Sequence, residues 1–265
     1  MTAIKDKVVW ITGASSGIGE ALSKEYAKLG AKLILSARRE AELQRVKKEC
    51  ALQDDRCLVL PLDLGAHDQM EEKVRLALDH FGQIDILINN GGISQRSLVR
   101  DTDFSVYKKL IDIDYLGIVA LSKAVLPHFI ERKSGHFAAV TSLMGKFASP
   151  LRSGYCGAKH AVHGFFDALR MEHHDDNIKV TLICPGFIRT NVSMNALTKN
   201  GSKQETMDNK TGAGMAPEKC AQKIISGIRR NKMEITVGGI ETFAVYFKRF
   251  FPSLLHSIAR KAAVT

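Results

Sequence analysis

Tyr155 and Lys159 have the residue types and the spacing that suit proton transfer in this 265-residue chain. Residues at positions i and i+4 share one face of a helix, so the phenol and the ammonium would lie side by side. An ammonium close to a phenol stabilises the phenolate, which makes such a pair a usable acid and base near neutral pH. Ser142 ends an apolar run upstream, from where its hydroxyl can hold a substrate oxygen. A tyrosine and a lysine at this spacing also occur by chance on helix surfaces, so the prediction depends on the accompanying motifs.

A glycine-rich turn near the start of the chain predicts a diphosphate site. The stretch TGASSGIG (12–19) follows the apolar run VVWIT (8–12) and leads into a helical pattern. Glycine lets the backbone approach a phosphate closely, and a helix N-terminus adds N–H donors and a favourable dipole. A plain tight turn is the alternative, and the absence of a GK[ST] pattern argues against a nucleoside triphosphatase. The residues expected to contact the diphosphate are Gly13, Ser15, Ser16, Gly17, Ile18 and Gly19.

The residues after the second apolar run indicate which dinucleotide binds. KLILSA (32–37) ends at Ala37, the position where an acidic residue would bind the ribose 2′-hydroxyl of NAD(H), and Arg38 and Arg39 follow it. Because arginine makes paired hydrogen bonds to phosphate oxygens, the sequence favours NADP(H). A water-facing arginine pair at a helix start is the alternative. Further cofactor contacts are expected after the third and fourth runs, at Asp63, Leu64, Asn90, Gly91 and Gly92.

The elements that must position these residues alternate along the chain. Short, nearly continuous apolar runs are typical of parallel strands covered on both faces, and amphipathic helical patterns separate them. This alternation predicts an α/β fold, a single Rossmann-like doubly wound domain over 1–265. The expected strands are 8–12, 32–37, 57–62, 85–89, 136–142, 179–185 and 234–238, and the expected helices are 17–30, 39–53, 67–80, 103–132, 154–176 and 217–231.

Two segments fall outside this alternation. The polar segment 195–215 predicts either a mobile lid or a disordered insertion. Residues 240–262 mix aromatic and basic side chains, which predicts a C-terminal amphipathic extension (about 240–265) interrupted at Pro252. That extension could close over the core or the substrate pocket, join subunits, or contact a membrane surface peripherally. We favour packing or an oligomer contact over the membrane.

Bulk composition sets broad limits. The net charge is +10, but no Lys/Arg run or aromatic platform predicts a nucleic-acid partner. The 5 cysteines are scattered without CxxC or metal-type spacing, which indicates reduced thiols and no metal site. With neither a signal peptide nor a membrane-spanning apolar stretch in the sequence, we expect a cytoplasmic protein, with membrane association through the tail as the alternative.

Together these motifs resemble the short-chain dehydrogenase/reductase (SDR) family over about residues 6–240. The narrower stretch TSLMGK (141–146) and the tail resemble the branch near 11β-hydroxysteroid dehydrogenase. The matching residues are Thr12, Gly13, Gly17, Gly19, Asn90, Gly91, Gly92, Ser142, Tyr155, Lys159, Pro185, Gly186 and Thr190.

The resemblance implies a seven-stranded parallel sheet with helices on both faces, in a homodimer or homotetramer. Tyr155 would exchange the proton, Ser142 would position the carbonyl and Lys159 would bind the nicotinamide ribose. The residues implied to flank the nicotinamide are Pro185, Gly186, Ile188 and Thr190. An apolar pocket for a steroid, retinoid, lipid or xenobiotic carbonyl would be lined by Ser142, Leu143, Met144, Phe147, Tyr155 and Phe187.

Two residues depart from the family pattern. Gly91 stands where alanine is usual, and Asp114 stands where an asparagine usually supports a proton relay. We expect Asp114 to support catalysis, with a purely structural helix residue as the alternative. The sequence therefore predicts an NADP(H)-dependent oxidoreductase that interconverts an alcohol and a carbonyl, or alternatively an NADP(H)-binding sensor without turnover.

Overall fold

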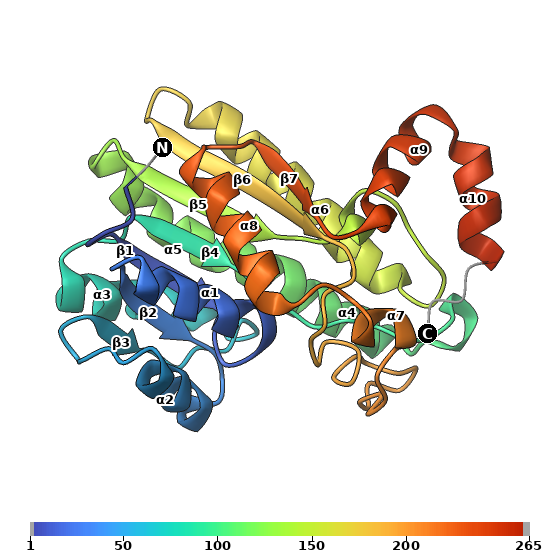
Figure 1. The fold of residues 1–265 in the computed structure, drawn as a ribbon, viewed down its shortest axis with the longest axis horizontal. Coiled ribbons are helices and arrows are strands. Elements are labelled where there is room, and N and C mark those ends of the chain that lie inside the picture. Colours follow the sequence, from blue (N-terminus) through green and yellow to red (C-terminus); the bar gives the residue numbers. More distant parts are fainter. Residues whose placement is uncertain (1–2, 262–265) are drawn as a thin grey trace.

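A seven-stranded parallel sheet forms the centre of the computed structural model, which describes residues 3–261. Its strand order is β3-β2-β1-β4-β5-β6-β7 (Figure 1). The predicted α/β fold is confirmed. The order reverses between β1 and β4, and ligands of such sheets bind at this switch, outside the carboxyl ends of the strands. The strands are β1 (Val8–Thr12), β2 (Lys32–Ser36), β3 (Cys57–Val59), β4 (Ile86–Asn89), β5 (Gly135–Val140), β6 (Ile178–Pro185) and β7 (Glu234–Val237).

Helices cover both faces of the sheet (Figure 1). Side chains alternate along β1, so Val9 and Ile11 face one helical layer while Val8 and Trp10 face the other. The first layer holds α1 (Gly17–Lys28), α2 (Glu40–Glu49) and α8 (Pro217–Arg229). The second holds α3 (Met70–Phe81), α5 (Gly117–Glu131) and α6 (Ser153–Glu172). That residues 1–265 form one domain stays a prediction, and residues 262–265, the end of the predicted extension, lie outside the described part.

The prediction of a single helix over 103–132 is wrong in one respect. This segment consists of α4 (Phe104–Ile111), a π-helical turn η3 (Asp112–Leu116) and α5. The Gly117 amide donates to the carbonyl of Asp112, five residues back, instead of four. A Cβ on Gly117 would overlap the backbone of Leu64, so this close approach requires glycine. Such turns often mark functional sites.

Other elements differ from the sequence prediction mainly in length. The helices expected to reach residues 53 and 176 end at Glu49 and Glu172, and turns fill the remainder. Ala51 and Asn177, in these turns, have positive φ angles that a helix cannot continue. The shorter elements are η1 (His67–Gln69), η2 (Val99–Asp101), η4 (Leu143–Gly145), α7 (Asn209–Gly212) and η5 (Ile240–Phe243).

The polar segment 195–215 packs against the turn that follows β4. Leu197 donates its amide to Ser94 and accepts the amide of Arg96 on its own carbonyl. Asp208 is buried and pairs with the guanidinium of Arg96 at 2.5 Å and with that of Arg152 at 3.4 Å. These contacts attach the segment to the body of the protein, and its action as a lid stays a prediction.

The C-terminal extension forms α9 (Ala244–Phe250) and α10 (Pro252–Lys261), and the two helices meet at Pro252 as expected. They gather at the same end of the molecule as α7 (Figure 1). Within residues 3–261, no helix is both long and apolar enough to cross a bilayer. One side packs onto the body, while the aromatic side is exposed at Phe243, Tyr246, Phe247, Phe250 and Phe251.

Candidate active site

The glycine-rich turn has the geometry of an anion site. Gly13 and Gly17 adopt positive φ angles of 65° and 59°. Ser16 is the extended N-cap of α1, and its side chain makes no capping hydrogen bond. The first N–H groups of a helix lack intrahelical partners, so without a side-chain cap they remain available to a phosphate. The turn therefore fits the diphosphate of a dinucleotide.

The turn is held against the end of β4. Asn90 and Gly91 donate their amides to the hydroxyl oxygen of Thr12, each at 2.9 Å. Gly13 has a positive φ, and a Cβ on it would lie 2.8 Å from the Cα of Gly91, so Gly13 does not tolerate a side chain. The predicted residues of the first and fourth strands thus come together at the switch in strand order.

Three other predicted cofactor residues lie around this turn. Leu64 packs against Gly91, and Thr190 lies 3.1 Å from the position of a Cβ on Gly17. Asp63 is exposed and accepts the amide of Gly65 at 3.0 Å, so its carboxylate is already engaged in a local turn.

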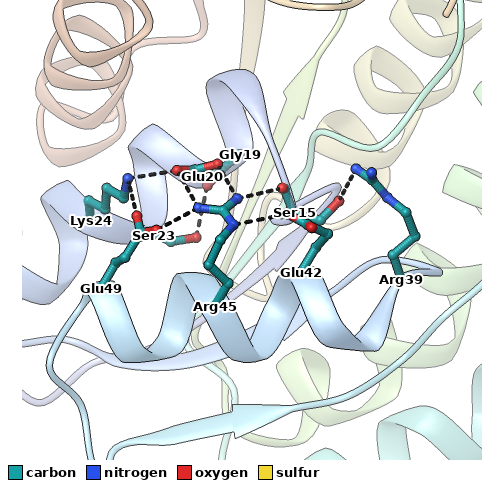
Figure 2. Close-up of polar contacts among 9 residues, drawn as sticks. All are labelled: Ser15, Gly19, Glu20, Ser23, Lys24, Arg39, Glu42, Arg45 and Glu49. Atoms are coloured by element: carbon teal, nitrogen blue, oxygen red, sulfur yellow. Dashed lines mark hydrogen bonds and ion pairs between the residues drawn. The ribbon is translucent and has the colours of Figure 1, made fainter.

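Arg39 points toward the turn from the end of β2. Its Nη2 lies 3.5 Å from the hydroxyl of Ser15 (Figure 2). Among residues 3–261, neither Arg38 nor Arg39 takes part in an ion pair with a carboxylate that the structure records. A guanidinium in this position is free to bind an added phosphate.

Arg45, which the sequence interpretation missed, ties α2 to the same turn (Figure 2). Its guanidinium pairs with Glu20, Glu42 and Glu49 at 2.8–2.9 Å and donates to the carbonyl of Ser15 at 3.3 Å. The hydrogen bond from Arg45 lowers the pKa of Glu20. The spacing of Glu42 and Glu49 around Arg45 signals a charged helix face, but not its contact with α1.

Ser142 and α6 meet at the carboxyl ends of the strands. Ser142 follows β5, is the N-cap of η4, and accepts the amide of Met144 on its hydroxyl at 3.1 Å. A Cβ on Gly145 would lie 2.9 Å from the ring of His163, so η4 sits directly on α6. The Nζ of Lys159 lies 5.6 Å from the ring centroid of Tyr155. The structure thus places the predicted phenol and ammonium side by side on the helix against which the Ser142 turn packs.

Gln95 fixes the start of α6, and no sequence pattern indicates this role. Its side-chain oxygen accepts the amide of Gly154 at 2.8 Å and that of Tyr155 at 3.4 Å. Tyr155 also packs against the cluster formed by Val106, Leu110 and Leu197, to which the segment 195–215 contributes Leu197.

Asp114 and Lys159 form a buried ion pair, with 3.6 Å between Oδ2 and Nζ. Burial raises the pKa of Asp114, against the opposing charge of Lys159. Burial lowers the pKa of Lys159, but the charges of Asp114 and Tyr155 outweigh it and leave that pKa raised. Asp114 Oδ1 accepts the amide of Ile93 at 2.8 Å, whereas Oδ2 has no hydrogen-bond partner within the described chain. An acceptor is therefore available beside the ammonium for a further donor.

His163, a second buried polar residue that the sequence analysis did not identify, supports the Ser142 turn. His163 Nε2 lies 3.1 Å from the hydroxyl of Thr141, the neighbour of Ser142. Burial lowers the pKa of His163 to about 4, so the imidazole is neutral near pH 7. It therefore acts as a hydrogen-bonding brace.

The apolar residues predicted to line the substrate pocket cluster around η4. Leu143 and Phe147 are buried, and Met144 and the tail pack against them. Two cavities, of about 440 and 540 Å³, flank the site, and neither is lined by Ser142 or Tyr155. Of the predicted substrate contacts, Phe187 lines the larger of the two. The larger cavity is lined by Phe187, Lys210, Ala213, Gly214, Met215, Ala216, Lys219, Gly239 and Glu241.

Known proteins are similar to this chain in both sequence and fold. The family model described as short chain dehydrogenase matches residues 7–201. The chain is 45% identical over 263 residues to the Drosophila melanogaster "Dehydrogenase/reductase SDR family protein 7-like", covering 97% of this chain and 81% of that protein. It is 44% identical over 239 residues to human "Dehydrogenase/reductase SDR family member 7", covering 88% of this chain and 70% of that protein.

Solved structures agree at the level of the fold. An SDR from Burkholderia phymatum in complex with NAD superposes with a TM-score of 0.86 at 19% identity, covering 100% of this chain and 99% of that one. Levodione reductase superposes with a TM-score of 0.79 at 25% identity, covering 89% and 97%. The narrower resemblance to the 11β-hydroxysteroid dehydrogenase branch stays a prediction.

The family model spans most of the sheet and both halves of the candidate site, and the relatives above cover nearly the whole chain. The chain therefore belongs to the short-chain dehydrogenase/reductase family, oxidoreductases whose fold binds a nicotinamide cofactor.

Proposed function

We propose that this protein interconverts an alcohol and a carbonyl on a hydrophobic substrate with NADP(H). The observation that carries the proposal is the Tyr155–Lys159 pair on α6, against which the Ser142 turn packs. This group and the glycine-rich turn both lie at the carboxyl ends of the strands, where sheets of this order bind ligands.

The chain's own residues would hold the substrate oxygen and move its proton. In reduction, the Ser142 hydroxyl donates a hydrogen bond to the carbonyl oxygen, and the Tyr155 hydroxyl transfers its proton to that oxygen. Lys159 stabilises the phenolate that this transfer leaves, and in oxidation that phenolate takes the proton from the alcohol. Asp114 holds Lys159 in place and keeps it charged. The nicotinamide, when bound, supplies or accepts the hydride at the carbon.

The proposed cofactor residues come from several segments of the chain. Lys159 would also hold the nicotinamide ribose, and Pro185, Gly186, Ile188 and Thr190 would flank the nicotinamide. Arg38 and Arg39 would bind the adenosine 2′-phosphate, because no described carboxylate neutralises them. This choice of NADP(H) rests on the arginines alone.

The cofactor choice has a direct test in Arg39→Ala. The variant should raise the KM for NADPH at least about tenfold, the effect of losing a hydrogen bond to a charged group, and leave the KM for NADH nearly unchanged. Steady-state kinetics with both cofactors measures it. Equal use of NADH and NADPH by the unaltered protein would overturn the choice.

Turnover itself is tested with a panel of steroid, retinoid, lipid and xenobiotic carbonyls, by following NADPH oxidation. Tyr155→Phe removes the transferable proton and keeps the ring, so it should lower kcat by about a hundredfold or more. If the protein is instead a cofactor sensor, the wild type and Tyr155→Phe should both bind NADPH, and neither should oxidise it. Failure of the folded, NADPH-bound protein on the whole panel would count against the enzyme.

The tail and the assembly complete the proposal. We infer a cytoplasmic homodimer or homotetramer, packed through α4–α5 and α6, without nucleic acid. The exposed aromatic side of the tail and Lys248 and Arg249 suit peripheral contact with an anionic bilayer. Co-sedimentation with phosphatidylserine vesicles, for the full chain and one ending at residue 239, tests that contact, and equal binding by both would contradict it.

A further inference from the structure

Glu241 lies between the C-terminal tail and the turn after β6. It belongs to η5, just after β7. Its Oε1 accepts the amide of Phe187 at 3.1 Å and the amide of Gly239 at 3.0 Å. Phe187 follows Pro185 and Gly186, the residues proposed to flank the nicotinamide. One carboxylate therefore joins the tail to the turn on the cofactor side of the site.

Three glycines make room for this carboxylate. A Cβ on Gly186 would overlap Glu241 Oε1, a Cβ on Gly238 would lie 2.5 Å from it, and a Cβ on Gly239 would lie 3.0 Å from Oε2. No real Cβ tolerates the first two distances, so a side chain at Gly186 or Gly238 would displace the carboxylate. The backbone on both sides is thus shaped around Glu241.

The tail that begins at Glu241 reaches the other side of the substrate region. Ala244, Val245 and Leu255 pack against the cluster formed by Leu143, Phe147 and Cys184. Leu143 directly follows Ser142. The tail therefore bridges two segments, the turn after β6 and the turn after β5, between which the substrate would lie.

We propose that Glu241 is a positioning residue that fastens the tail (240–261) across the substrate pocket. The fastened tail joins Ala244, Val245 and Leu255 to the cluster of Leu143 and Phe147, and the apolar wall that they form together selects large apolar carbonyl compounds over small ones. The proposal rests on the proposed function for its substrate part and on the structure alone for the fastening.

Two variants release the carboxylate in different ways. Glu241→Ala removes it, whereas Gly238→Ala leaves Glu241 intact and occupies its place. Both should raise the KM for a large apolar carbonyl about tenfold, the cost of a lost hydrogen bond to a charged group, with little change for a small carbonyl or for NADPH. Glu241→Gln keeps an oxygen acceptor for both amides and should restore the KM. Glu172→Ala, an exposed glutamate at the end of α6, is the matched control.

A second measurement does not depend on turnover. Lys248 and Arg249 are exposed on α9, so a loosened tail should be cut there by trypsin faster in Glu241→Ala and Gly238→Ala than in Glu172→Ala. Unchanged cleavage would overturn the fastening. Faster cleavage with an equal rise in KM for large substrates, small substrates and NADPH would overturn the selective wall. Absence of turnover in the wild type would overturn the proposed function. The trypsin comparison would still test whether Glu241 fastens the tail.

Discussion

At the scale of single residues, the departure with the clearest chemical consequence is Asp114. A carboxylate 3.6 Å from the Lys159 ammonium partly cancels the field that this ammonium exerts on its other neighbour, Tyr155. An amide at the same place would not. The carboxylate therefore keeps Lys159 charged but reduces the field of that ammonium at the phenol.

Asp114→Asn tests this effect. Asparagine keeps an oxygen for the Ile93 amide, so the π-helical turn should persist. With the carboxylate charge removed, the Lys159 ammonium is no longer opposed, so the rising limb of the pH–rate profile for alcohol oxidation should move to lower pH. A purely structural role for Asp114 would lower the rate without moving the limb, and an unmoved limb contradicts the prediction.

At the scale of elements, Arg45 connects two helices around the diphosphate turn. Glu20 lies in the first turn of α1, where its charge would repel a bound diphosphate. Arg45 and Lys24 pair with that carboxylate. The pair of helices thus presents a neutralised entrance to the phosphate site.

Arg45→Ala should therefore weaken the binding of NADPH and of NADH to the same extent. We expect both KM values to rise a few-fold, about 0.5–1 kcal/mol, as befits a partly exposed ion-pair network. Adding Glu20→Gln should recover the part due to charge, and Arg75→Ala, on the exposed side of α3, serves as control. Loss of NADPH binding alone would mean that Arg45 itself holds the 2′-phosphate and would refute the shared effect.

The elements also separate what the sequence could predict from what it could not. All seven strands were predictable because each is a short apolar run flanked by turn residues, and Tyr155 with Lys159 because their contact is local. The π-helical turn was not, because it depends on Gly117 meeting Leu64 and on Asp114 meeting Ile93, residues distant in sequence. Gln95, Arg45, His163 and Glu241 share this cause, since each acts through a long-range contact.

At the scale of the whole molecule, two buried imidazoles tie stability to pH. Burial lowers the pKa of both His136 and His163 from 6.5 to about 4. The unfolded chain therefore binds more protons between these values, so stability is full above pH 6.5 and is lost as the pH falls toward 4. Protonation of each imidazole lowers the free energy of unfolding by at most about 3 kcal/mol.

His136→Asn checks this linkage. Asparagine can still bond to Thr181, the partner of His136 at 2.8 Å, but it cannot take up a proton. Its free energy of unfolding should fall less steeply than that of the wild type between about pH 7 and about pH 5, as followed by urea denaturation. His174→Asn, on an exposed side chain, should keep the wild-type slope. An unaltered slope in His136→Asn would contradict the linkage.

The strand order also bears on how the chain is made. β1 lies inside the sheet between β2 and β4, but along the sequence the helices α1, α2 and α3 separate β1 from β4. While a ribosome is still extending the chain, one edge of the first strand has no neighbour until Ile86–Asn89 has emerged. A nascent chain of this topology exposes an apolar, unpaired edge during synthesis, and that interval is when it is most open to aggregation and most suited to chaperone capture.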